Sequence, residues 1–323
     1  MPRKARLSVP GAVTHAMARC IDGRYLLTDD EDGRFFVNTL SRCLIESSCP
    51  CYAWALMKNH YHVLLRLGEG ELWETFKPLN TQLAQFHNRK YGRRGPLFMD
   101  RFKSIVTQDQ NYIEELVRYV HLNPLRAGLC KVAHDLHHYP WSGHRAILGL
   151  DTHQFQDTQT VLRLFGRTGA SAQKAYLAFL SEGAAKQDSN DIVAFVRSSN
   201  DGSEKGEGPR RWVIGDPDFV RKVVTDSRAR KLRLSRFQRE GADFTPIALT
   251  ACKAFAVTRE ALLRRHRGGP ASDARRCFCF IAVRCCGARG TEVARYLGIH
   301  PTAVSAMLRK GRKLAETKGL LSI

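Results

Sequence analysis

The sequence is short of acidic residues and of long apolar runs. It has 31 Asp or Glu against 51 Lys or Arg, a net charge of +20 over 323 residues. No segment approaches the roughly 20 apolar residues that a membrane-spanning helix needs, and the basic start, Met1–Arg6, leads into no apolar run typical of a signal peptide. These absences predict a cytoplasmic protein that has no membrane partner.

Paired cysteine motifs are also missing. The ten cysteines include no Cys-x-x-Cys pair, and the adjacent Cys285 and Cys286 suit neither a zinc site nor a disulfide framework. We therefore expect reduced thiols that lie mostly in the core, as is usual in a cytoplasmic protein.

The positive charge is distributed unevenly along the chain. Residues 210–323 hold 25 Lys or Arg and 9 Asp or Glu, a net charge of +16, whereas the preceding 209 residues carry only +4. A basic region joined to a nearly neutral one indicates a polyanion-binding module, and nucleic acid is the expected polyanion. The polar composition of residues 181–209 is typical of a linker. We predict domains at 1–180 and 210–323.

Residue periodicity predicts an α+β fold for the first domain. Strands are expected at 9–21, on both sides of Lys58–Asn59 within 51–65, and over 97–107; amphipathic helices are expected from Asp29 to about Ser47 and at 71–91. The order strand, helix, strand, strand, helix, strand is that of a ferredoxin-like unit. Another helix is expected to begin near Asp109 and to stop at Asn123, because a proline follows.

Two histidines lie two residues apart on the third predicted strand. Side chains alternate along a strand, so His60 and His62 share a face while Tyr61 points to the opposite one. Two imidazoles on one rigid strand can hold a divalent metal or a phosphate. The alternative is a solvated strand face, which the spacing alone does not exclude.

Tyr119 and Asn123 lie one turn apart on the helix that follows. Together they can deliver a phenolate nucleophile and an amide oxygen ligand to one point, or they can serve as core packing and a helix-end cap. Tyr112 is a competing nucleophile, but its partner one turn later is Leu116. The pattern therefore favours Tyr119.

These motifs together resemble the single-tyrosine HUH transposases, most closely the branch associated with repetitive extragenic palindromes. The resemblance covers about residues 5–180 and is carried by His60–His62, Gly95–Lys103 and Tyr119–Gly128. It implies a ferredoxin-like HUH nuclease fold and an endonuclease that cuts single-stranded or hairpin DNA. Such an enzyme forms a covalent 5′-phosphotyrosine and leaves a 3′-hydroxyl.

The resemblance also implies a role for each matched residue. His60 and His62 would bind the metal and Tyr119 would be the nucleophile, while Asn123 stands where many relatives carry glutamine as a third ligand. A mixed nitrogen and oxygen ligand set suits Mg²⁺ or Mn²⁺. Arg101 and Lys103 are expected at alternate positions of a strand near the site, where they contact phosphate or face solvent.

The basic domain contains a helix-turn-helix pattern at about residues 288–312. Val293, Ala294 and Leu297 form an apolar stripe before Gly298, and Pro301 then opens a second helix. The pattern resembles the DNA-binding domain of the replication initiator DnaA. The outward residues that would face double-stranded DNA are Thr302, Ser305, Arg309 and Lys310.

The sequence leaves two other functions open. One is a DNA-binding regulator of palindromic elements that has the same fold but no catalysis. The other is a metal-dependent hydrolase that uses the histidine pair to activate water, although no suitably spaced acidic ligand accompanies the pair. The transposase and the DNA-binding regulator are both expected at the nucleoid. The sequence decides neither the oligomeric state nor the target DNA.

Overall fold

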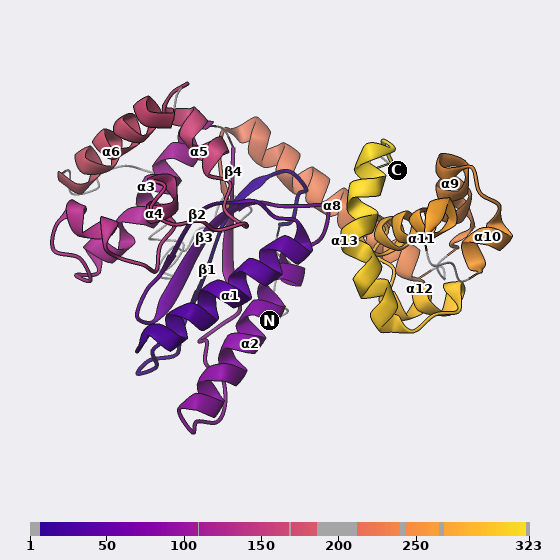
Figure 1. The fold of residues 1–323 in the computed structure, drawn as a ribbon, viewed down its shortest axis with the longest axis horizontal. Coiled ribbons are helices and arrows are strands. Elements are labelled where there is room, and N and C mark those ends of the chain that lie inside the picture. Colours follow the sequence, from indigo (N-terminus) through magenta and orange to yellow (C-terminus); the bar gives the residue numbers. More distant parts are fainter. Residues whose placement is uncertain are drawn as a thin grey trace. The chain divides into compact units, whose positions relative to one another are not determined.

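The structure is a computed structural model that describes residues 7–108, 110–167, 169–185, 212–239, 243–264 and 268–320. Contacts within the chain divide it into two compact units, Met1–Val224 and Thr225–Ile323 (Figure 1). The first unit combines a sheet with helices, and the described part of the second contains helices alone. The chain is therefore α+β, as the sequence predicts.

The sheet of the first unit has five strands in the order β2-β3-β1-β4-β5. Their bounds are β1 Val13–Arg19, β2 Cys51–Leu56, β3 His60–Arg66, β4 Lys103–Thr107 and β5 Val213–Ile214. The first four pair antiparallel, whereas β5 runs parallel to β4. The predicted order of strands and helices is confirmed, but β5 is an addition that no pattern in the sequence indicated.

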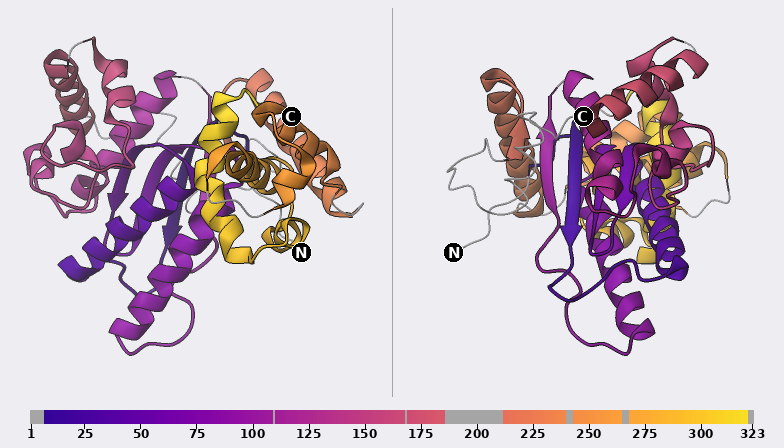
Figure 2. Two further views of the ribbon diagram at one scale, coloured as in Figure 1. Left: turned by 45° about the vertical axis from the view of Figure 1, so that its right-hand side comes forward. Right: turned by 90° about the vertical axis from the view of Figure 1, so that its left-hand side faces the viewer.

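Helices cover both faces of this sheet (Figures 1 and 2). α1 (Asp30–Ser47) and α2 (Leu72–Lys90) pack on one face, and α3 (Gln110–Arg126) packs on the other. The helices that follow, η1 (Ala133–His137), α4 (His144–Ile147), α5 (Thr158–Phe165) and α6 (Gly169–Ala185), extend the α3 side. The sheet thus has one face toward α1 and α2, and a second face toward α3.

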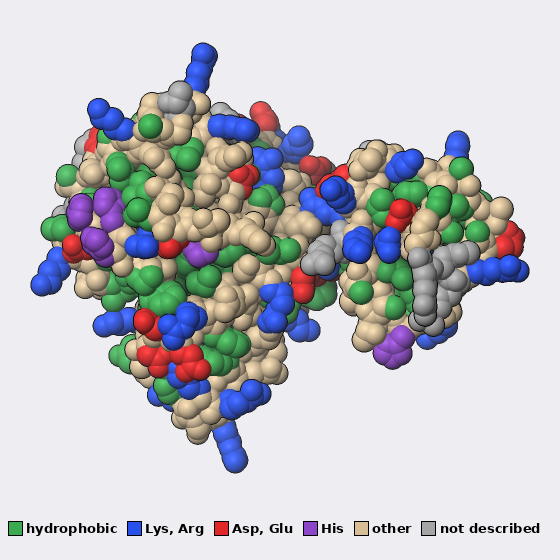
Figure 3. All heavy atoms as spheres, viewed as in Figure 1, with side chains coloured by type: hydrophobic (Ala, Val, Ile, Leu, Met, Phe, Trp, Pro, Cys, Tyr) green, Lys and Arg blue, Asp and Glu red, His purple; other side chains and the backbone are tan. Residues whose placement is uncertain are grey.

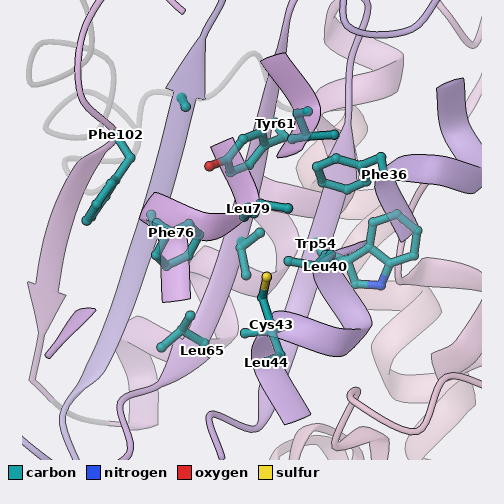
Figure 4. Close-up of a cluster of buried hydrophobic side chains, with 14 of the residues drawn as sticks. Phe36, Leu40, Cys43, Leu44, Trp54, Tyr61, Leu65, Phe76, Leu79 and Phe102 are labelled. Carbon is teal, nitrogen blue, oxygen red and sulfur yellow. The ribbon is translucent and has the colours of Figure 1, made fainter. Parts of the chain in front are cut away.

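The core between the sheet and α1 and α2 is strongly aromatic (Figure 4). Phe36 of α1 lies against Trp54 of β2 and Tyr61 of β3, with ring centroids 6.3 and 5.4 Å away. All three side chains are fully buried. Because Tyr61 points into this core, its two histidine neighbours on β3 must face α3.

Acidic residues at the start of α1 cap the helix. The Asp29 side chain accepts a hydrogen bond from the Asp32 amide, and Asp32 accepts one from Thr28. The Lys90 ammonium pairs with Asp29 and Asp32 at 2.7 and 2.9 Å. Figure 3 shows acidic side chains gathered beside basic ones on the first unit. This cluster is a capped helix start, because each described carboxylate has a helical or cationic partner.

Two extended segments are shorter than expected. The first strand begins at Val13 instead of residue 9, and the 97–107 segment forms a strand only from Lys103. Within 97–102, Phe98 makes an isolated bridge with Cys20, and Met99 donates to the Arg19 carbonyl at 3.0 Å. The chain therefore touches the end of β1 before the continuous pairing of β4 starts.

The expected linker lies largely outside the described residues. Residues 181–185 are the end of α6, and 186–211 are not described. Residues 213–223 belong to the first unit, because β5 pairs with β4 and α8 (Pro217–Arg239) places Val220 and Val223 against Val106. The boundary between the units thus falls inside α8, after the expected domain start at 210.

The second unit packs short helices around one core. They are α9 (Thr245–Phe255), α10 (Arg259–Leu263), α11 (Gly269–Phe280), a π-helical turn η3 (Ile281–Cys285), α12 (Gly290–Leu297) and α13 (Pro301–Thr317). At Gly311 a Cβ atom would lie 2.0 Å from the Arg276 carbonyl oxygen, so only glycine allows α13 to pack this closely on α11. In the described part of the chain, no helix is long and apolar enough to cross a membrane.

Candidate active site

The two histidines of β3 share one face of the sheet, as their spacing predicts, and this face is turned toward α3. Their ring centroids lie 5.0 Å apart, with the planes nearly perpendicular. His62 is opposite Met17 of β1 and Ala55 of β2, so it lies in the middle of the sheet and is only 1% exposed. His60 begins the strand and is half-buried, which leaves it at the more open end of the pair.

A third histidine, His15 of β1, joins this pair. Its Nε2 lies 2.9 Å from Nδ1 of His62, and the two rings are stacked with centroids 5.1 Å apart. His15 pairs with Leu64, the residue two positions after His62, so both histidines point to the α3 face. The sequence placed residue 15 in a strand but could not give the register that brings it to His62.

Tyr119 of α3 lies directly over these imidazoles. Its ring centroid is 5.6 Å from that of His62 and 5.9 Å from that of His15, edge-on in both cases. The side chain is 5% exposed, and the Arg126 guanidinium lies 5.2 Å from the ring centroid. β1, β3 and α3 thus bring three imidazoles, a phenol and one cation together.

Asn123 lies one turn after Tyr119, and its side chain donates to backbone carbonyls where a proline interrupts the hydrogen bonds of the helix. The expected helix end at Asn123 is wrong, because α3 continues through Pro124 to Arg126. Proline has no N–H to donate to the backbone carbonyl four residues back, which here is that of Val120. Instead, Nδ2 of Asn123 lies 3.5 Å from the Val120 carbonyl oxygen and 2.7 Å from the backbone carbonyl oxygen of Tyr119. The amide nitrogen is thereby occupied. A ligand role for its amide oxygen stays a prediction.

Burial keeps the imidazoles of this site neutral. It lowers the pKa of His15 to about 4, and burial together with the Arg19 charge lowers the pKa of His60 to about 4. The pKa of His62 is held well below its ordinary value by burial first, and then by Coulombic interactions with His60, His15 and Arg126 that disfavour a further positive charge. A neutral imidazole keeps one nitrogen lone pair, which is the form that coordinates metals.

The ring nitrogens of His60 and His62 are the donors that the structure brings together here, and the Asn123 amide oxygen is the predicted third ligand. The described residues contain no group of three or more His, Cys, Asp or Glu side chains able to hold an ion. This donor set fits a divalent ion that keeps several positions for oxygen atoms from outside the protein. Among the described residues, this set has no carboxylate ligand of the kind that the hydrolytic alternative would usually recruit.

The predicted phosphate-contacting residues differ in position. Lys103 is the first residue of β4 and is opposite Met17, so it lies in the same cross-strand row as His62 and is half-buried. Arg101 is exposed but precedes β4, so the expectation that both residues lie on one strand is wrong. Only Lys103 is held by the sheet on the histidine side.

His121 takes no part in this site. Its Nδ1 lies 2.8 Å from the Tyr176 hydroxyl, which also lies 2.7 Å from Nδ1 of His144. All three side chains are fully buried. His121 therefore has a structural role, and it is too buried to touch DNA.

In the second unit, α12 and α13 flank a left-handed turn. Gly298 has φ +63°, which suits glycine, and Val293 and Leu297 are buried as predicted. On α13, Val304 is buried, and Thr302, Ser305 and Lys310 are exposed, whereas the side chain of Arg309 lies outside the described residues. α11 completes the core of this unit.

Comparison with known proteins gives little. No family model matches the chain, and no curated protein does. One solved structure, described as the REP-associated tyrosine transposase bound to a REP hairpin, has 17% sequence identity and a TM-score of 0.38, covering 47% of this chain and 89% of that chain. A likeness this low decides nothing, and the site must be understood from its own geometry.

Proposed function

We propose that this protein is a metal-dependent single-stranded DNA endonuclease and strand transferase of the HUH transposase type. The observation that carries the proposal is the position of Tyr119, whose ring lies edge-on to His62 with centroids 5.6 Å apart. Nucleophile and metal-binding imidazoles come from elements far apart in sequence, so their meeting is a property of the fold. The ferredoxin-like order of the first unit supports the same assignment.

The proposed chemistry is an in-line attack on a phosphodiester. The Tyr119 hydroxyl gives up its proton and its oxygen forms a bond to the scissile phosphorus, the bond from that phosphorus to the 3′ oxygen breaks, and the 3′ oxygen takes up a proton and leaves as a 3′-hydroxyl. His60 and His62, with Asn123, would hold Mg²⁺ or Mn²⁺, which supplies charge stabilisation for the scissile phosphate. Lys103, in the row of His62, would contact the DNA backbone.

The second unit is proposed to bind double-stranded or folded DNA. Its charge supports this, since residues 225–323 hold 21 Lys or Arg and 7 Asp or Glu, a net charge of +14. Thr302, Ser305 and Lys310 are exposed on α13, the helix that would enter the major groove together with Arg309. The unit would then hold the enzyme near its hairpin substrate and place the protein at the nucleoid.

The test is a covalent adduct on DNA. A pool of hairpins with randomised single-stranded flanks, labelled at the 3′ end, is incubated with the full chain and Mn²⁺. The label should migrate with the protein after denaturation, because the 5′ phosphate of the downstream fragment stays on tyrosine. Tyr119→Phe should abolish the adduct, whereas Tyr112→Phe, which changes the competing tyrosine on the same helix, should retain it.

Other results would identify the alternatives. Cleavage without an adduct would indicate a hydrolase, and binding without cleavage would indicate the regulatory function. An adduct that persists in Tyr119→Phe would remove the assigned nucleophile. Each of these outcomes contradicts the proposal.

A further inference from the structure

Both imidazoles of the candidate metal pair are held at the same ring atom. Nδ1 of His60 lies 2.8 Å from Oδ1 of Asn59, and Nδ1 of His62 lies 2.9 Å from Nε2 of His15. Neither Asn59 nor His15 belongs to the proposed ligand or nucleophile set. The same ring atom is therefore occupied in each histidine, by a partner of different chemistry.

Asn59 fixes the tautomer of its neighbour. An amide oxygen can only accept a hydrogen bond, so His60 must carry its proton on Nδ1 and keep its lone pair on Nε2. Asn59 is itself anchored, because its backbone carbonyl accepts a hydrogen bond from the Cys20 amide at 2.7 Å. That contact ties the β2–β3 turn to the end of β1.

His15 can hold His62 in either of two ways. If His15 donates from Nε2, the proton of neutral His62 must lie on its own Nε2, and that atom then has no lone pair for a metal. If His62 donates from Nδ1, His15 accepts and Nε2 of His62 is free to coordinate. The second arrangement puts the His15 proton on Nδ1, a buried atom that has no partner among the described residues.

We propose that Asn59 and His15 are positioning residues that hold His60 and His62 with both Nε2 lone pairs available to one divalent ion. The inference rests on the metal site of the proposed function and adds to it the device that orients the ligands. Metal-binding histidines commonly donate their second N–H to such a partner, and losing that partner weakens metal binding about 10–100-fold. Here the acceptors are an amide and a neutral imidazole, where a carboxylate is often found.

The experiment measures Mn²⁺ affinity of the full chain by calorimetry, without DNA. His15→Phe keeps the ring but removes the acceptor, and His15→Gln restores an acceptor oxygen. Asn59→Leu and Asn59→Asp form the second pair in the same way. His87→Phe is the matched control, because His87 is a buried histidine on α2, on the opposite face of the sheet.

We expect His15→Phe and Asn59→Leu to weaken Mn²⁺ binding about 10–100-fold, and His15→Gln and Asn59→Asp to recover most of it. His87→Phe should bind as the wild type does. Thermal unfolding of every variant shows whether its fold is intact. If His15 had only a structural role, His15→Phe and His15→Gln would not differ in metal affinity. Equal affinity in His15→Phe and wild type would overturn the inference, as would a His15→Gln variant no better than His15→Phe.

The inference and the proposed function fail in different ways. If the wild type binds Mn²⁺ with the expected variant pattern but forms no adduct on hairpin DNA, the positioning residues stand and the strand transferase is wrong. If the wild type binds no Mn²⁺, His60 and His62 are not ligands and the inference is refuted. An adduct formed equally well by wild type and His15→Phe at low Mn²⁺ would leave the strand transferase intact and refute the inference.

Discussion

The two faces of the same sheet are built from different chemistry. Toward α1 and α2, β3 presents Tyr61 and Val63 to an apolar core in which Phe36 and Trp54 are also fully buried. Toward α3, the same strand presents His60 and His62, and β1 adds His15. A strand of seven residues thus supports the fold with one set of alternating side chains and carries the candidate site with the other.

This contrast between the two faces explains why the site can be buried and still be polar. The core face pays no penalty for desolvation because its side chains are apolar. On the α3 face the imidazoles become neutral instead, and their ring nitrogens bond to one another or to an amide. Substitutions on the two faces should therefore separate activity from stability.

The largest expected effect is on the site face. Changing both His60 and His62 to Ala should reduce adduct formation by about 1000-fold, since bound metal contributes several kcal/mol of transition-state stabilisation. The quantity to measure is the single-turnover rate of adduct formation at saturating Mn²⁺. A rate within tenfold of wild type would show that the pair is not needed for the chemistry.

On the core face the effect should appear in stability. Phe36 is fully buried between Trp54 and Tyr61, so Phe36→Ala should lower the free energy of unfolding by about 3–5 kcal/mol. Urea denaturation measures it, and Phe35→Ala, at the half-buried neighbouring position, is the control with a smaller expected loss. The folded Phe36→Ala protein should bind Mn²⁺ normally; a loss of both properties would break the separation of the faces.

Acid should destabilise the α3 side. Burial first, then the charges of His137 and Arg145, lowers the pKa of His144 to about 3, and Tyr176 and His121 also face it. A depressed histidine pKa means that the unfolded state binds more protons, so stability is full above about pH 6.5 and falls as the pH drops toward 3. His144→Phe should flatten part of this slope between pH 6 and 4 in urea titrations. An unchanged slope would contradict the assignment of a neutral buried imidazole.

The smallest effect is expected in the second unit, where the proposed contacts with DNA are electrostatic. Lys310 is exposed on α13, and Lys310→Ala should weaken DNA binding modestly and reduce the salt slope of the binding constant by about 1. Fluorescence anisotropy on duplex DNA at several salt concentrations measures both. Lys253→Ala, an exposed position on α9, is the control and should leave the slope unchanged.

Local periodicity predicted what depends on neighbours in the chain. Alternation on β3 placed His60 and His62 on one face, and the helix repeat placed Asn123 one turn after Tyr119. It could not give the strand register that joins His15 to His62, because register depends on packing between segments 47 residues apart. It also missed that the Asn123 amide satisfies the carbonyls around Pro124, so that α3 does not stop there.

The central claim is that Tyr119 is the nucleophile that bonds covalently to DNA, and peptide mapping of the protein–DNA adduct tests it most directly. Trypsin separates the two candidates on α3, because Tyr112 lies in the peptide 104–118 and Tyr119 begins the peptide 119–126. After nuclease digestion, mass spectrometry should find the nucleotide mass on the 119–126 peptide. A nucleotide on the 104–118 peptide, or on neither, would contradict the account.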